Sequence, residues 1–333
     1  MKKKGLYDNH GRLINYLRLA VTDRCNLRCF YCMPEKGIDF ADKKELFSYE
    51  EMRRTVQFLV TMGIEKLRIT GGEPFVRKDM MDFLYAMSKL EDLKKINITT
   101  NGTLTEHLVP EFKKLRIHSV NLSLDTIDRE RFHEITRRDE LSTVLKTLDQ
   151  LLYHGIDTKI NTVVMEGKNT EDIIPMVELA RELPVNVRFI EEMPFNGSGD
   201  RYPVLNWNHH KILDHIRQVF PDLYKIEDPL YSTSANYHIP MFKGTFGIIA
   251  AYSRTFCGTC NRLRITSKGL LKTCLYDSGI FNIKDMMRAG ATDAEIKGAY
   301  FAAIENRAKD GWEAENLRLP GNEISESMTS IGG

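Results

Sequence analysis

Short apolar stretches alternate with longer amphipathic segments along the first 190 or so residues of the chain. The short stretches are typical of strands, and segments whose apolar positions recur every three or four residues are typical of helices. Ser48 and Glu51 form a capping box, which predicts a helix whose Met52, Val56 and Leu59 share one face. The predicted strands are Asn15 to Val21, Lys66 to Thr70, Lys95 to Thr99, Ser119 to Leu124, Thr158 to Met165 and Asn186 to Glu191.

The repeat of strand and helix predicts parallel strands joined by crossover helices. Six such units are too few for a closed eight-stranded barrel. We therefore expect an α/β fold in which residues 1–193 form an incomplete (β/α)6 TIM-type barrel and residues 194–333 form a C-terminal α+β domain that covers its open side. In this second part we expect helices at 207–220, 282–289 and 293–307, and short strands at 237–242, 247–252 and 263–266.

Composition and charge point to no nucleic-acid or membrane partner. The 333 residues are 42% hydrophobic, enough for a full core, and 47 basic against 46 acidic residues give a formal charge of +1. This balance provides no global field for nucleic acid or an anionic membrane, and no apolar run approaches the roughly 18 residues that span a bilayer. We expect a cytoplasmic protein without a nucleic-acid or membrane partner, either a monomer or a homodimer.

Three cysteines stand close together early in the chain. Cys25, Cys29 and Cys32 follow the spacing C-x3-C-x2-C within D-R-C-N-L-R-C-F-Y-C-M-P, so one loop can wrap three thiolates around one inorganic centre. A 4Fe-4S cluster normally takes four thiolates, and three leave one iron free to chelate S-adenosylmethionine (SAM). A zinc site is less favoured because no Cys or His follows Cys32 closely. A disulfide framework is less favoured because six cysteines are sparse in a chain of this length.

A second group of three cysteines lies near the end of the chain. Cys257, Cys260 and Cys274 follow the spacing C-x2-C-x13-C. This pattern resembles a zinc ribbon that lacks one ligand, for which a nearby histidine is a candidate, and it equally suits a second cluster with its own open iron. The spacing alone leaves both possibilities open.

Positive charges occupy positions inside the predicted strands. Side chains of a barrel strand alternate between the interior and the helix layer, so each of these cations is buried or lines the interior, where an unpaired charge is costly. Pairing with Glu73, Asp125, Glu191 or Glu192 would satisfy any single one, but so many cations on separate strands favour a polyanionic ligand. These residues are Arg18, Arg68, Lys159, Arg188, Arg262 and Arg264.

Polar turns follow the predicted strands, where the active sites of barrels gather. They comprise Gly71 to Pro74, Thr99 to Gly102, Ser123 to Asp125, and Met193. One such turn is weak evidence, but four on successive strands describe a site.

The cysteine loop, the G-G-E-P turn and the incomplete barrel resemble the radical SAM enzymes. Within this superfamily, the chain is similar over nearly its whole length to the GTP 3',8-cyclases of molybdenum cofactor biosynthesis. The segments that carry this resemblance are L-R-I-T-G-G-E-P, I-T-T-N-G, N-L-S-L-D-T, F-C-G-T-C-N-R-L-R-I-T and the terminal I-G-G. Two positions depart from that family. Leu27 is often aromatic there, and Ser327 stands where a basic residue is common.

The resemblance implies two 4Fe-4S clusters, on Cys25, Cys29 and Cys32 and on Cys257, Cys260 and Cys274. It implies that SAM is cleaved at the first cluster and that the resulting radical removes hydrogen from carbon 3' of GTP, which then bonds to carbon 8. It further implies that Gly332 and Gly333 enter the channel between the clusters and hold a catalytic arginine and GTP in register. The implied SAM contacts are Tyr31, Gly72, Ser123 and Met193, and the implied GTP contacts are Arg18, Arg68, Thr99, Lys159, Arg262 and Arg264.

The implied partners are a reductant protein and cyclic pyranopterin monophosphate synthase, which would receive the product. Two other functions remain open from the residues. A peptide-modifying radical SAM enzyme with an auxiliary cluster is one, although such enzymes carry more cysteines in the second half. An iron-sulfur or zinc regulatory module without catalysis is the other.

Overall fold

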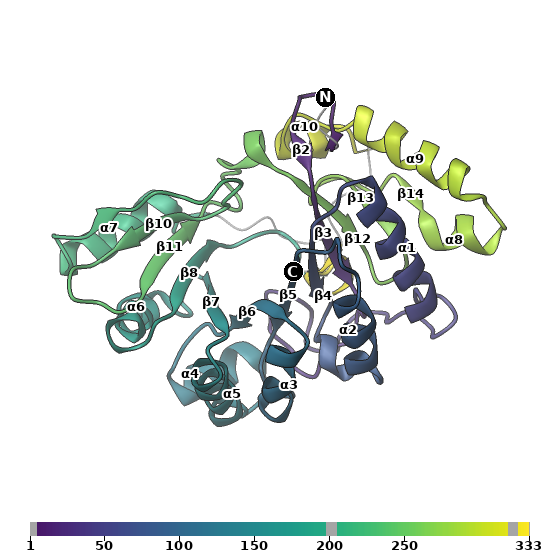
Figure 1. Ribbon diagram of the computed structural model, residues 1–333. Coiled ribbons are helices and arrows are strands. Elements are labelled where there is room, and N and C mark those ends of the chain that lie inside the picture. The colour runs from purple at the N-terminus through teal and green to yellow at the C-terminus, as the bar shows by residue number, and fades with distance from the viewer. Residues whose placement is uncertain (1–4, 198–204, 319–325, 333) are drawn as a thin grey trace.

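The computed structural model describes residues 5–197, 205–318 and 326–332. Its centre is a curved sheet that opens into an arc, with helices on the outer face (Figure 1). The six predicted strands form the parallel middle of this sheet, each beside the next, which confirms the incomplete barrel. They are β3 (Tyr16–Ala20), β4 (Lys66–Thr70), β5 (Lys95–Thr100), β6 (Ile117–Ser123), β7 (Asp157–Val164) and β8 (Asn186–Glu191).

Strands from the second part of the chain lengthen the same sheet at both edges. β12 (Arg262–Ile265) pairs in parallel with β3, and β11 (Thr245–Ile249) pairs in parallel with β8. Antiparallel strands follow outward on each side, and a separate two-stranded ribbon stands near the N-terminus. These are β13 (Leu270–Lys272) and β14 (Phe281–Asn282) beyond β12, β10 (Ala235–His238) and β9 (Tyr224–Lys225) beyond β11, and the ribbon β1 (Leu6–Tyr7) and β2 (Leu13–Ile14).

Helices follow most of the strands. The predicted capping box opens α1, where the Ser48 side chain accepts from the Glu51 amide, and Gly63 ends it at φ +114°. The helices are α1 (Tyr49–Met62), α2 (Met80–Ser88), α3 (Val109–Lys114), α4 (Arg129–Thr136), α5 (Leu141–Tyr153), α6 (Ile173–Glu182), α7 (His209–Val219), α8 (Ile283–Arg288), α9 (Asp293–Glu305), α10 (Gly311–Asn316) and α11 (Met328–Ile331). Short 3-10 turns lie at Pro74–Val76, Glu106–Leu108, Thr170–Asp172 and Cys257–Thr259.

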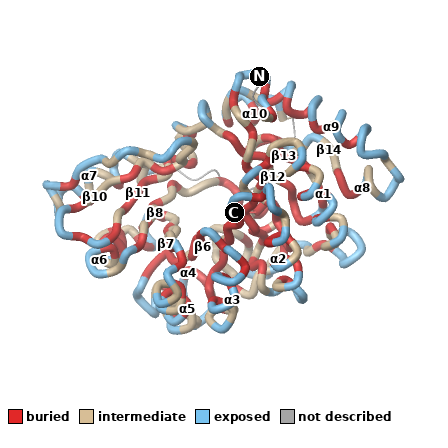
Figure 2. The backbone as a smooth tube through the Cα atoms, viewed as in Figure 1, coloured by how far each residue is buried: buried red, intermediate tan, exposed pale blue. Residues whose placement is uncertain are grey.

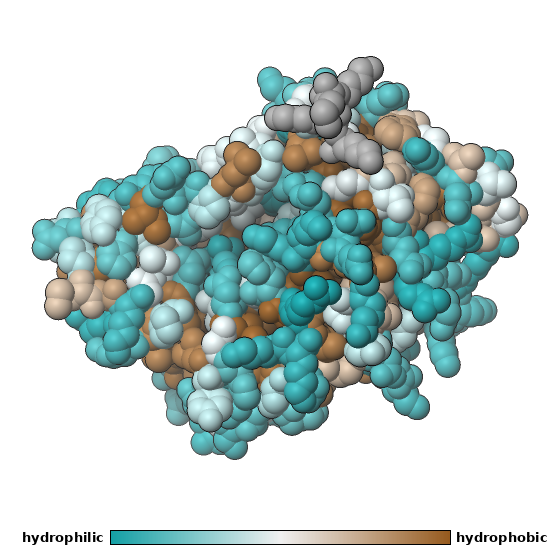
Figure 3. All heavy atoms as spheres, in the orientation of Figure 1, coloured by the Kyte–Doolittle hydropathy of each residue, from teal (hydrophilic) through white to brown (hydrophobic). Residues whose placement is uncertain are grey.

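The core lies between the sheet and the outer helices, and buried residues follow the strands (Figure 2). Leu67 and Ile69 are fully buried in it, whereas Arg68 between them lines the inner side of the arc. This alternation is what the sequence predicts for β4. The outer parts of the face in Figure 3 are mostly hydrophilic. Within the described ranges, no helix combines the length and apolar character needed to cross a membrane.

Candidate active site

A cavity of about 480 Å³ on the inner side of the sheet contains cysteines of both triads in its wall. Cys32 comes from the first triad, and Cys257, Cys260 and Cys274 come from the second. A smaller cavity of about 100 Å³ is lined by the whole first triad. The two cavities share wall residues, so they adjoin each other. The shared residues are Tyr31, Cys32, Thr99, Ser123 and Met328.

The predicted ligand contacts gather around these two cavities. Tyr31, Ser123 and Met193 line the larger one, and Gly72 lines the smaller one. Every residue predicted to contact GTP lies in the wall of the larger cavity, namely Arg18, Arg68, Thr99, Lys159, Arg262 and Arg264. Gly332 lies within reach of this wall, because its carbonyl oxygen accepts a hydrogen bond from Arg264. Gly333 lies outside the described residues.

The first triad is held by a tight loop between β3 and α1. The amide of Cys32 donates to the carbonyl of Cys29 at 3.0 Å, and the side-chain amide of Asn101 donates to Cys25 Sγ at 3.6 Å. Burial, and then the charge of Glu73, raises the pKa of the Cys25 thiol to about 11. Burial, and then the neighbouring Cys32, raises the pKa of Cys29. Cysteines whose pKa is raised in this way become thiolates when they bind a metal. Three such cysteines beside a cavity fit an iron-sulfur cluster.

The G-G-E-P turn packs against the backbone just before this triad. A Cβ atom on Gly72 would lie 2.2 Å from the carbonyl oxygen of Arg24, so only glycine fits there. The Glu73 amide donates to that same oxygen at 2.9 Å. The buried Glu73 carboxylate accepts from the Asn101 amide at 2.7 Å and from Thr100 Oγ1 at 2.8 Å. The turn therefore fixes both the loop that carries Cys25 and the side chain that contacts its sulfur.

Tyr31 is fixed from the opposite wall. Its hydroxyl donates to Asp125 Oδ2 at 2.7 Å, and the amide of Val163 donates to Asp125 Oδ1 at 2.8 Å. Burial raises the pKa of Asp125 to about 6. The pair ties the cysteine loop to the ends of β6 and β7, and Asp125 belongs to the polar turn predicted after β6.

The second triad has an asymmetric charge environment. Burial would raise the pKa of Cys260, but the charges of Arg262 and Arg307 lower it to about 6. Burial raises the pKa of Cys274 to about 11. In the part of the chain that the structure describes, no three His, Cys, Asp or Glu side chains converge closely enough to ligate one metal ion. All three thiols line the larger cavity, and three cysteine ligands beside a cavity are the donor set of a cluster that keeps one open iron.

The cations of the cavity stand side by side on neighbouring strands. Arg18 lies opposite Arg68 on one side and opposite Arg264 on the other. Burial, and then the charge of Arg264, lowers the pKa of Arg18, while burial, and then the charge of Arg68, lowers the pKa of Arg188 to about 10. Such mutual repulsion would be relieved by a polyanion in the cavity.

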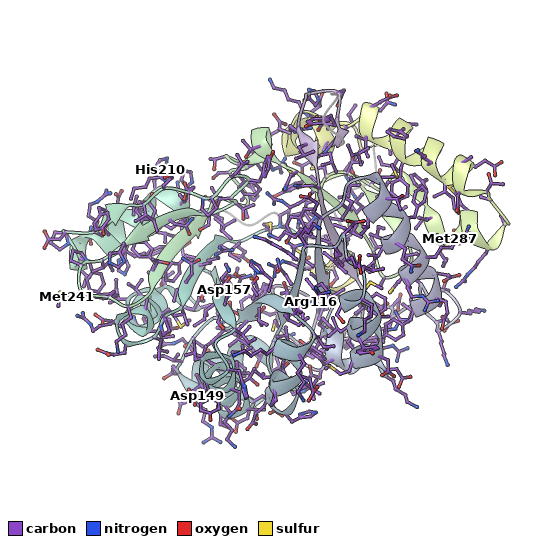
Figure 4. All side chains as sticks on the ribbon, viewed as in Figure 1. Arg116, Asp149, Asp157, His210, Met241 and Met287 are labelled. Atoms are coloured by element: carbon purple, nitrogen blue, oxygen red, sulfur yellow. The ribbon has the colours of Figure 1, made fainter. Side chains whose placement is uncertain are left out.

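Two cations differ in their present partners. Arg262 Nη2 is buried, and no hydrogen-bond partner for it occurs among the described residues. Lys159 instead pairs with Asp157, the first residue of β7, labelled in Figure 4. We therefore expect Arg262 to meet a ligand directly, whereas Lys159 must exchange one anionic partner for another.

Several cavity residues were absent from the predicted set of contacts. Lys66 and Tyr16 were not singled out, and Arg188 was predicted as an interior cation but not as a GTP contact; all three line the larger cavity. Tyr16 and Lys66 stand two residues before Arg18 and Arg68 on the same strands, and that spacing places them on the same face. Tyr16 Oη accepts from Arg68 Nε at 2.6 Å, and Lys66 Nζ lies 4.3 Å from the centre of the Tyr16 ring. Although burial alone would raise the pKa of Tyr16, the charges of Arg68, Arg18 and Lys66 lower it to about 7.

Two protein-family models match the chain in succession. The model of the Radical SAM superfamily matches residues 19–180, and the model named Molybdenum Cofactor Synthesis C matches residues 185–312. The GTP 3',8-cyclase of Syntrophomonas wolfei is 39% identical over 340 residues, covering 98% of this chain and 100% of that protein. The GTP 3',8-cyclase of Clostridium perfringens is 38% identical, covering 98% and 99%.

Longer proteins also match. Molybdenum cofactor biosynthesis protein 1 of Homo sapiens is 38% identical over 311 residues, covering 91% of this chain and 48% of that protein. The corresponding protein of Bos taurus is 39% identical with the same coverage. The chain thus spans about half the length of these curated relatives.

Solved structures share the fold at low identity. SuiB of Streptococcus suis has a TM-score of 0.63 at 14% identity, covering 93% of this chain and 70% of that one. A structure of anSMEcpe with bound AdoMet has a TM-score of 0.56 at 18% identity, covering 81% and 75%. These likenesses establish the architecture, while the sequence relatives establish the family.

Proposed function

Because the chain belongs to the GTP 3',8-cyclase family of radical SAM enzymes, we propose that it converts GTP to (8S)-3',8-cyclo-7,8-dihydroguanosine 5'-triphosphate. This is the first step of molybdenum cofactor biosynthesis. One observation carries the proposal: a single cavity has cysteines of both triads and cations of several strands in its wall. A site of this composition suits a reaction that needs a cluster near a polyanionic substrate.

The family supports SAM and an iron-sulfur cluster, and we propose that each triad holds one 4Fe-4S cluster. Cys25, Cys29 and Cys32 would hold the first cluster, which would supply the electron for reductive cleavage of SAM, and Cys257, Cys260 and Cys274 would hold the second, which would bind the purine. Tyr31, Ser123 and Met193 line the larger cavity and would contact SAM there. Gly72 would contact SAM from the wall of the smaller cavity, which it shares with Cys25.

The protein's own contribution to GTP binding is charge and orientation. Arg262 and Arg264 alternate with Leu263 on β12, so their guanidinium groups face the cavity together and suit phosphate oxygens. Arg18, Arg68 and Lys159 would complete the contacts with the triphosphate, and Thr99 would contact the nucleotide from β5. Lys66 and Arg188 add two further cations to the wall of the same cavity. The carbonyl of Gly332 would hold Arg264 in register with the substrate.

A peptide-modifying radical SAM enzyme is the alternative within the same fold. SuiB, which shares the architecture, has a structure described as bound to the precursor peptide SuiA. A peptide cavity has no need of so many mutually repelling cations. Their presence on β3, β4, β7, β8 and β12 therefore favours the nucleotide.

The test is anaerobic incubation of the reconstituted protein with SAM, dithionite and GTP, followed by chromatography for 5'-deoxyadenosine and the cyclised nucleotide. Dithionite takes the place of the proposed reductant protein. We expect both products in equal amounts, and neither from the Cys29→Ala variant. Adding cyclic pyranopterin monophosphate synthase should consume the product. Deoxyadenosine that forms equally with and without GTP, with no cyclised nucleotide, would contradict the proposed substrate.

A further inference from the structure

A buried ionic network lies directly behind the second cysteine triad. It consists of Asp8 and Arg12 from the ribbon β1–β2 and Arg307 from the segment after α9. Their exposed fractions are 7%, 8% and 3%. Arg12 Nε contacts Asp8 Oδ2 at 2.6 Å, and Arg307 Nη1 contacts the same oxygen at 3.2 Å. One carboxylate thus orients two guanidinium groups from opposite ends of the chain.

Both guanidinium groups reach the backbone that carries the cysteines. Arg307 donates to the carbonyl oxygen of Cys260 at 2.9 Å and to that of Thr273, which precedes Cys274, at 3.0 Å. Arg12 donates to the carbonyl oxygen of Cys257 at 3.2 Å. All three cysteine positions are therefore tied to this one network.

Arg307 also contacts a sulfur atom. Its Nη2 donates to Cys260 Sγ at 3.0 Å. In the first triad, the sulfur of Cys25 is contacted by the neutral amide of Asn101, at the longer distance of 3.6 Å. The second triad is thus distinguished by a charged donor on one of its sulfurs.

Hydrogen bonds to sulfur and nearby charge are two of the factors that set the reduction potential of an iron-sulfur cluster. Reduction adds one negative charge to the cluster, and a fixed cation that contacts a ligand sulfur stabilises the reduced form. Because Arg307 is buried, solvent screens its charge less than it would at the surface.

We propose that Arg307, held by Asp8 and Arg12, is a positioning residue that raises the reduction potential of the cluster on Cys257, Cys260 and Cys274. This inference rests on the proposed second cluster. The N-terminal ribbon then belongs functionally to the distant cysteine triad, although hundreds of residues separate them in sequence. Its role is to aim a cation at one sulfur.

The test is a redox titration of the full-length protein with dithionite and mediator dyes, followed by electron paramagnetic resonance. The signal of the second cluster is assigned by comparison with the full-length Cys29→Ala chain. We expect Arg307→Gln to shift that signal to a more negative potential. The ratio of reduced to oxidised cluster at a fixed potential should fall roughly tenfold, which is about 59 mV for one electron. The signal of the first cluster should keep its potential.

Arg288→Gln is the matched control. Arg288 similarly joins a carboxylate, that of Glu51 at 2.7 Å, to the backbone carbonyls of Lys44 and Leu46, but it contacts no cysteine. This variant should leave both potentials unchanged, even if it lowers the melting temperature.

Arg307→Lys keeps the proposal testable if Arg307→Gln fails to hold iron. Lysine preserves the charge but cannot reproduce the fork that reaches Asp8, Cys260 and Thr273 together, so we expect a smaller shift in the same direction. Unchanged potentials in every iron-containing Arg307 variant would overturn the inference. Four irons per wild-type chain, instead of about eight, would contradict the second cluster itself, and the two failures are therefore distinguishable.

Discussion

Arg264 Nη1 donates a hydrogen bond of 2.8 Å to the carbonyl oxygen of Gly332. The C-terminal segment therefore reaches the inner side of the sheet, where helix α11 lies against β3. Gly332 has φ +81°, and a Cβ atom at this position would lie 2.3 Å from Thr70 Oγ1. Both the backbone conformation and the lack of space require glycine there.

We expect Gly332→Ala to displace the tail from Arg264 and to reduce cyclisation strongly, while iron content stays near that of the wild type. The measurement is deuterium transfer from 3'-deuterated GTP into 5'-deoxyadenosine. Gly290→Ala is the matched control, because Gly290 has φ +83° but a Cβ atom there would meet nothing within 4 Å beyond its chain neighbours. Both variants carry a left-handed alanine, which costs about 1 kcal/mol. Undiminished transfer in Gly332→Ala would show that the tail is dispensable for the radical step.

The two triads should respond differently to loss of a cysteine. Cys29→Ala should abolish 5'-deoxyadenosine formation, because the electron for SAM cleavage passes through the first cluster. Cys274→Ala should retain SAM cleavage at some level but lose the cyclised product, since the second triad is assigned to the purine. Chromatography of both products on each variant separates the two roles. Full-rate cyclisation by Cys274→Ala would refute that assignment.

Arg262→Ala should weaken binding of GTP far more than binding of guanosine. Arg262 Nη2 has no hydrogen-bond partner within the described ranges, and guanosine lacks the phosphates that it would contact. A lost charge-assisted contact is worth roughly 1.5 to 3 kcal/mol, so GTP affinity should fall about 10- to 150-fold. Isothermal titration with both ligands measures the difference, and the exposed Arg129, which pairs with Asp139, supplies the control Arg129→Ala. An equal loss of affinity for GTP and for guanosine would show that Arg262 has a structural role and does not contact the phosphates.

Ionisation of the Tyr16 phenol should make GTP binding depend on pH. Its pKa of about 7 means that the phenol is neutral below this pH and ionised above it. The ionised form places a negative charge beside Arg68 and Lys66, so affinity for a polyanion should decline as the pH rises through about 7. Tyr16→Phe should lack this decline. The measurement is the ratio of the wild-type Kd to the Tyr16→Phe Kd, taken at about pH 6 and at about pH 8. This ratio cancels the titration of GTP itself, which affects both proteins equally. A ratio that stays constant would contradict the proposed effect of Tyr16 ionisation.

Much of the barrel was predictable because each strand carries a local signal. Short apolar stretches such as that of β4, repeated in a cycle of strand, turn and helix, predicted all six parallel strands of the middle of the sheet. The cysteines and the arginines of β12 were recognisable by spacing and by charge at positions expected to be apolar. Their convergence on one cavity followed from two rules. Side chains of a barrel strand alternate between the interior and the helix layer, and barrel sites gather at the carboxyl ends of the strands.

Other features left no local signal. The pairing of β12 with β3 joins strands nearly 250 residues apart, as in Arg262 beside Tyr16, and no periodicity encodes such a partner. Lys66 and Tyr16 begin their strands, where a polar or aromatic residue is ordinary, so only the position two residues before a buried arginine could have revealed them. In the network of Asp8, Arg12 and Arg307, the pair Asp8 and Arg12 is local, but its contact with Arg307 spans almost the whole chain and depends on three-dimensional proximity.

The pairing of the later strands with both edges of the barrel has a consequence for synthesis of the chain. When the ribosome has completed β8, the outer edges of β3 and β8 still lack the neighbours that β12 and β11 later provide. Unpaired edges of this kind are templates for pairing with other chains, and nascent chains that expose them are prone to aggregate. Both edges are therefore covered only after the last third of the chain, which contains β11 and β12, has been synthesised. Slow translation between β8 and β12 would lengthen the period in which a chaperone is needed.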